Sequence, residues 1–89
     1  MQEDKKQYLL LMSEIVAKAI MIFGVEMAVL KAQSISELSV NRSGGVTAIN
    51  GYSADALQKL VNGYLELSNQ SARNIFDQIF AKYPTIKKI

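Results

Sequence analysis

The first third of the chain constrains the fold most, because it has the pattern of a helix that is apolar on nearly every side. Residues 4–33 are rich in Leu, Met, Ala, Glu and Lys, which favour helical structure. At about 100° per residue the polar side chains share one sector, yet some apolar side chains project into it too: Leu11, Ile15, Ile22, Val25 and Val29. A helix of this kind is normally buried on several sides, so one partner helix cannot cover it.

The middle of the chain, residues 34–51, has the pattern of a β-hairpin. Leu38 and Val40 alternate with polar residues, and the β-prone run 46–49 follows a loop that contains Gly44 and Gly45. A two-stranded hairpin is marginal on its own in water, so we expect this one to pack on the helices. The alternative is an all-α helical hairpin in which these residues form only a loop.

The last third predicts a second helical segment, from about Ser53 to Tyr83, which Pro84 ends. The run at 68–71 interrupts it, because Ser and Asn side chains compete with the helical backbone for hydrogen bonds. We expect either a kink there or two helices, over about 54–67 and 69–83. Residues 84–89 are expected to form a loose tail.

Together these segments predict a single small α+β domain over residues 1–89, mostly helical, in the order long helix, hairpin, long helix with or without a kink. The first helix would be about 45 Å long. Two such helices form a rod too thin to enclose an interior, so we expect a two-fold dimer with a helical-bundle core. The residues that we expect in this core or at the dimer interface are Leu11, Ile15, Ile22, Val25, Val29, Phe76 and Phe80.

Two glycines lie inside the expected helices. If the helices run antiparallel, Gly24 and Gly63 lie level and predict a close crossing of the two backbones. In the alternative interpretation each glycine is an independent kink or tolerated site.

The residue types exclude several kinds of chemistry. The chain has no Cys, His or Trp, which removes disulfides, thiolate and imidazole catalysis and the standard zinc sites. Its carboxylates lack the spacing of a calcium loop, and Gly44-Gly45 lacks the pattern of a phosphate-binding loop. Glu26 is a candidate general acid or base if it is buried, although a solvated glutamate is the favoured interpretation. We therefore expect no enzyme activity, cofactor or metal.

The apolar stretch from Tyr8 to Leu30 is long enough for a membrane span, but it contains Glu14, Lys18 and Glu26. Charged residues are costly in a bilayer, so a helix buried in protein is the better interpretation. The N-terminus does not match a signal peptide well, and the expected location is the cytoplasm.

Three functions remain. We expect first a non-catalytic, homodimeric interaction or regulatory module, because the first helix has excess apolar surface. The alternative is a carrier or sensor of a small apolar ligand, held between helices by the Met and Phe side chains, although core packing is the commoner role of such residues. A weaker alternative is a nucleic-acid-associated regulator that uses the basic C-terminal residues Lys82, Lys87 and Lys88. The net charge of +2 neither demands nor excludes an acidic partner. We expect the chain to bind itself, as a homodimer or a higher homo-oligomer, or another protein, rather than nucleic acid or a membrane.

Overall fold

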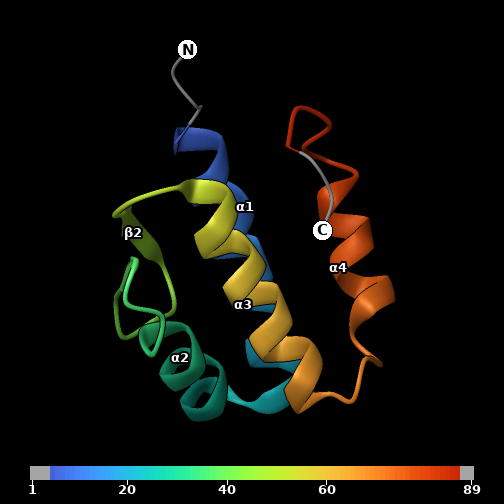
Figure 1. Cartoon of the computed structure of the whole chain (residues 1–89). Coiled ribbons are helices and arrows are strands. Elements are labelled where there is room, and N and C mark those ends of the chain that lie inside the picture. Colours follow the sequence, from blue (N-terminus) through green and yellow to red (C-terminus); the bar gives the residue numbers. More distant parts are fainter. Residues whose placement is uncertain (1–4, 87–89) are drawn as a thin grey trace.

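The computed structural model describes residues 5–86 and shows four helices there, with an antiparallel hairpin between the second and the third (Figure 1). The helices are α1 (Lys5–Phe23), α2 (Val25–Gln33), α3 (Ser53–Leu67) and α4 (Arg73–Phe80), and the strands are β1 (Leu38–Val40) and β2 (Val46–Ile49). The predicted mostly helical α+β class is confirmed. The all-α alternative is wrong, because β1 and β2 form a paired sheet.

The prediction of one long helix over residues 4–33 is wrong, because the chain changes direction at Gly24. This residue has φ +91° and ψ 157°, a conformation that essentially only glycine adopts. Backbone hydrogen bonds continue on both sides: Gly24 N–H donates to the Ile20 carbonyl at 2.8 Å, and Ala28 N–H donates to the Gly24 carbonyl at 3.1 Å. The turn therefore redirects the helix without leaving these backbone groups unpaired.

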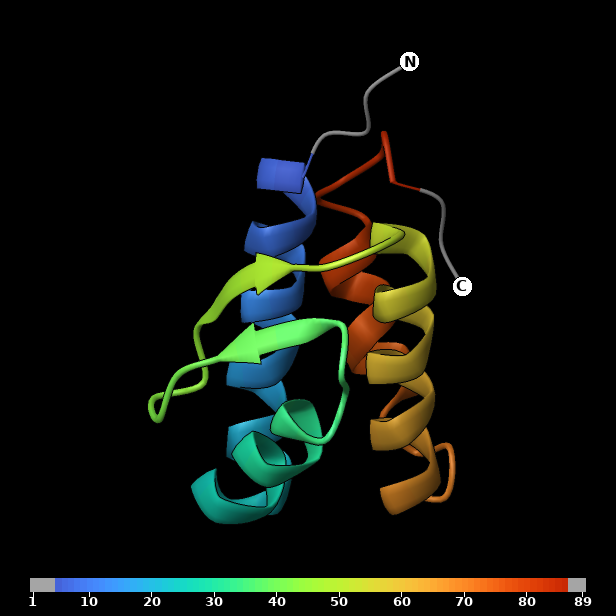
Figure 2. The same cartoon turned by 60° about the vertical axis from the view of Figure 1, so that its left-hand side comes forward.

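The second helical segment is also divided, which confirms the two-helix alternative for the region around 68–71. The chain takes positive φ at Asn69 (54°) and Gln70 (72°), between α3 and α4. Gln70 N–H donates to the Leu65 carbonyl at 2.8 Å and closes the end of α3. This turn lets α4 return along α1 (Figure 2).

The hairpin lies across α1 (Figure 2). Leu38 pairs with Ile49 and Val40 with Val46, with an irregularity between Ser39 and Val40. Val46 N–H donates to Ser13 Oγ of α1 at 3.1 Å. The hairpin thus packs on the helices, as expected for a sheet of two strands.

The core draws buried side chains from every helix and both strands of the described chain. Tyr64 is central: its ring stacks on Phe23 at 5.9 Å between centroids and lies tilted against Phe76 at 6.1 Å. The described molecule measures 36 × 25 × 17 Å, so the expectation of a thin rod is wrong. The hairpin and the other three helices cover α1 within a single chain, and burial of this helix requires no second copy.

The C-terminal tail expected at 84–89 is described as far as Ile86. Ile86 is buried against the core, and its N–H donates to the Tyr83 carbonyl at 3.0 Å. Residues 87–89, including Lys87 and Lys88, lie outside the described residues.

Candidate functional site

The corner between α1 and α2 exposes several large apolar side chains close together in the chain. The residues of this corner patch are Met21, Ile22, Val25, Met27 and Leu30. Met21 is 78% exposed and Leu30 is 65% exposed. Large apolar side chains that cluster on a surface typically mark a place where another molecule binds.

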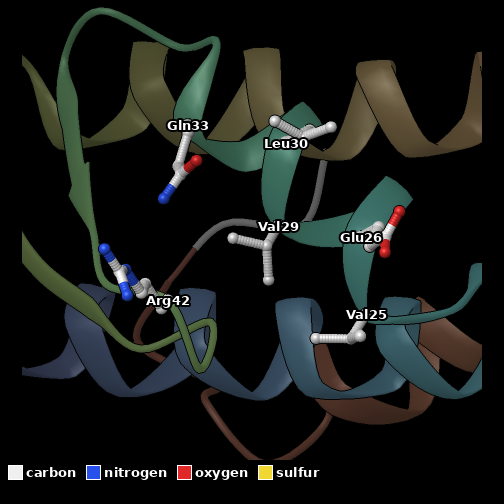
Figure 3. A pocket seen from close by; sticks show the side chains of 6 residues that line it. All are labelled: Val25, Glu26, Val29, Leu30, Gln33 and Arg42. Atoms are coloured by element: carbon white, nitrogen blue, oxygen red, sulfur yellow. The ribbon is translucent and has the colours of Figure 1, made fainter.

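A groove of about 410 Å³ lies beside this corner, between α2 and the hairpin loop (Figure 3). Its apolar wall consists of Val25, Val29 and Leu30 of α2. Arg42 lies at one end of the groove and Glu26 at the other (Figure 3). The groove therefore combines an apolar centre with opposite charges at its two ends.

Arg42 belongs to a loop that is ordered by hydrogen bonds of its own. The Asn41 side-chain oxygen Oδ1 accepts hydrogen bonds from Ser43 N–H at 3.0 Å, Ser43 Oγ at 2.8 Å and Gly45 N–H at 2.8 Å. Gly44 has φ +93° and lies against α1, where an added Cβ would be 2.9 Å from Val16 Cγ1. The backbone of the loop that carries Arg42 is thus organised from within and rests on α1.

The end of α2 is tied to the hairpin by Gln33, which also lines the groove. Its Nε2 donates to the Val40 carbonyl at 3.2 Å. At the other end of α2, Glu26 lies in the first turn, where a negative charge interacts favourably with the helix dipole. Within residues 5–86 neither Glu26 nor Arg42 forms an ion pair, and both side chains are exposed.

The residues predicted for the core or the dimer interface divide into two groups. Five are buried inside the single chain: Leu11, Ile15, Val29, Phe76 and Phe80. Ile22 and Val25 are 40% and 50% exposed and belong to the corner patch. Only these two remain accessible to a partner in the folded chain.

The two glycines do not face each other. An added Cβ at Gly24 would have nothing within 4 Å, whereas one at Gly63 would be 2.7 Å from Lys31 Cε. Gly24 is the point where the helix breaks, and Gly63 of α3 lies against the aliphatic part of the Lys31 side chain of α2.

The Met and Phe side chains proposed to line a pocket between helices are also divided. Met12, Phe76 and Phe80 are buried in the core, whereas Met21 and Met27 are exposed in the corner patch. Glu26 is exposed on α2, so it is not the buried carboxylate that a general acid or base at this position would require.

A second polar cluster joins α1 to the end of α4. Lys82 Nζ donates to Glu14 Oε1 at 2.8 Å, and the Tyr83 hydroxyl donates to Glu14 Oε2. These hydrogen bonds lower the pKa of Glu14, and the bond from the Tyr83 hydroxyl to Glu14 raises the pKa of Tyr83 to about 12. Lys82 thus binds within the chain, and of the three lysines suggested for nucleic-acid contacts it is the one that the structure describes.

Two kinds of site are absent from residues 5–86. No group of three or more acidic side chains lies close enough there to hold a metal ion. No helix in that range is long and apolar enough to cross a bilayer.

No family model, curated protein or solved structure shows a significant similarity to this chain. The candidate site is therefore described from its own geometry.

Sequence reasoning did not identify Leu30 as a surface residue or Arg42 and Glu26 as parts of one groove. In the sequence Arg42 is a charged residue of the expected hairpin loop, and Glu26 was considered as a general acid or base within an apolar helix. The one signal that could have connected them is Gly24, because a helix break there turns α2 back toward the hairpin.

Proposed function

We propose that this chain is a non-catalytic interaction module that associates with a second copy of itself. The observation that carries the proposal is the corner patch, which exposes five large apolar side chains near the one turn between α1 and α2, although the single chain already forms a buried core. Burying one such side chain is worth roughly 1.5–3 kcal/mol, so a symmetric contact that buries the patch twice would be favourable.

Paired substitutions test this role. Met21→Glu and Leu30→Glu place a charge in the corner patch, and we expect each to raise the dimer dissociation constant by about tenfold or more. Tyr52→Glu is the matched control, because Tyr52 is 77% exposed but lies outside the patch, before α3. Sedimentation velocity over a concentration series gives the constants. An equal effect of all three variants, or a wild type that is monomeric throughout, would contradict the proposal.

The volume and lining of the groove favour a second candidate, a carrier or sensor of a small apolar ligand. A space of about 410 Å³ with an apolar wall is within the usual range for ligand sites, and Arg42 would suit a carboxylate head group. A carrier should gain thermal stability with a medium-chain fatty acid, and Arg42→Gln should reduce this gain. A melting temperature that the fatty acid leaves unchanged would exclude this ligand class.

A further inference from the structure

We propose that a second copy of the chain docks on the groove itself, across a two-fold axis that brings Glu26 of each protomer to Arg42 of the other. This inference rests on the proposed function, since it specifies the surface and the register of the self-association. It goes further by assigning the two charges of the groove to partner recognition.

The arrangement of charge is self-complementary. Glu26 and Arg42 lie at opposite ends of the groove, with Val29 between them (Figure 3). A two-fold axis that lies in the plane of the contact and crosses the middle of the groove exchanges the two ends. Each carboxylate then meets a guanidinium, and the apolar wall of one copy meets that of the other. The same contact thus forms two ion pairs around an apolar centre.

The two charges are exposed on the single chain. Neither forms an ion pair within residues 5–86. Asn41 organises the loop that carries Arg42, and Gln33 fixes this hairpin to the end of α2. Both charged groups therefore lie on connected, hydrogen-bonded elements of the same face, which lowers the ordering cost of binding.

A second copy of the chain would contact more of the groove residues than a small anion or an apolar ligand would. A small anion would pair with Arg42 but leave Glu26 and the apolar wall unused. An apolar ligand would cover Val25, Val29 and Leu30 but leave Glu26 and Arg42 without a charged partner. A second copy supplies a carboxylate, a guanidinium and an apolar surface together.

Charge reversal gives a test that is specific for this register. In Glu26→Arg both ends of the groove are positive, and in Arg42→Glu both are negative, so each variant should repel itself. We expect the dissociation constant of each homodimer to rise roughly tenfold or more, because two ion pairs become two like-charge contacts. An equimolar mixture of the two variants should form a heterodimer, because every contact across its axis is again between opposite charges.

Native mass spectrometry of the mixture identifies the heterodimer by mass, and sedimentation velocity gives its affinity. The double variant with both reversals should dimerise with itself within about threefold of the wild type, because both pairs are restored with exchanged ends. Asp55→Arg is the control for a general charge effect, since Asp55 is exposed in the first turn of α3 and outside the groove. Circular dichroism checks that each variant is folded.

The outcomes separate this inference from the proposed function. A heterodimer from the mixture together with rescue in the double variant supports both. A wild-type dimer whose affinity neither reversal changes, or a mixture without heterodimer, overturns this register and leaves self-association standing. A wild type that is monomeric at every concentration, alone or with a bound fatty acid, overturns both.

Discussion

The Tyr64 hydroxyl connects two helices in the interior of the molecule. It donates to the Ala28 carbonyl of α2 at 2.6 Å from a ring that is fully buried in α3. Burial raises the pKa of Tyr64 above its usual range, so the hydroxyl keeps its proton at any ordinary pH. This bond, together with the stacking on Phe23, holds α2 and the end of α1 against α3.

We predict that Tyr64→Phe lowers the free energy of unfolding by about 1 kcal/mol, because it removes a buried hydrogen bond while keeping the ring. Tyr52→Phe is the control, since Tyr52 is exposed, and it should leave the stability unchanged. Urea denaturation monitored by circular dichroism measures both. Equal stability of the two variants would show that the hydroxyl contributes nothing.

The contacts of Glu14 predict a dependence of stability on acid pH. Its hydrogen bonds with Lys82 and Tyr83 lower its pKa below 4.5. A lowered pKa means that the folded state favours the carboxylate, so this contribution is present above pH 4.5 and is lost as the pH falls through the folded-state pKa. The contribution is small, because Glu14 is partly exposed.

We therefore expect Glu14→Gln to be less stable than the wild type near neutral pH and to approach it as the pH falls through the lowered pKa of Glu14. Glu66→Gln serves as the control, because Glu66 is exposed on α3 and forms no ion pair within residues 5–86. Urea denaturation at several pH values between 3 and 7, an interval that includes the ordinary pKa of a glutamate side chain, gives the comparison. A constant difference between Glu14→Gln and the wild type over this range would refute the linkage.

At the scale of elements, the break at Gly24 decides the fold. It turns α2 away from the line of α1, so that α2 contacts α3 and β1 as well as α1. The helical character of both segments could be predicted from their composition and periodicity. A kink at Gly24 was one of two predicted alternatives for this glycine, and its φ of +91° selects it. The direction in which α2 then runs could not be predicted, because it depends on contacts with α3 and β1, which are distant in the sequence.

The same substitution at two glycines should have opposite effects. Gly24→Ala has free space around its Cβ but a φ of +91°, so we expect a loss of about 1–3 kcal/mol in the free energy of unfolding. Gly63→Ala lies in the middle of α3 and meets only the flexible end of Lys31, so it should be neutral or stabilising by up to about 1 kcal/mol. Urea denaturation of both variants measures the difference. If both variants were strongly destabilised, a close backbone crossing would explain the data better than this structure.

The hairpin and the break between α3 and α4 show which features can be predicted from local sequence patterns. The strands were predictable because their alternation and the glycine-containing loop are local features. Two helices around 68–71 were one of two predicted alternatives, and the structure selects it through the positive φ angles at Asn69 and Gln70. The shared groove of Glu26 and Arg42 was not predictable, because it depends on how the chain turns at Gly24, between the two residues.

In the molecule as a whole, neighbouring elements of the same chain cover the apolar first helix, which the sequence alone did not predict. The sequence pattern led to the expectation that α1 needs a second copy, but α2, α3, α4 and the hairpin cover Leu11 and Ile15 completely. Among the described residues, five large apolar side chains stay exposed near the corner of α1 and α2, and Leu10, Tyr52 and Leu67 are exposed elsewhere. Self-association thus remains a proposal, with a different and smaller surface than the helical-bundle core first expected.

The concentration dependence of the native mass of the wild-type protein tests the proposed self-association most directly. Sedimentation equilibrium near neutral pH, extended from nanomolar to high micromolar concentration, should show a reversible change from the mass of one chain to twice that mass. The monomer at low concentration should keep its helical circular dichroism, because the core is complete within one chain. A single-chain mass at every concentration would contradict self-association through the corner patch. A dimer that unfolds whenever it dissociates would contradict the self-contained core.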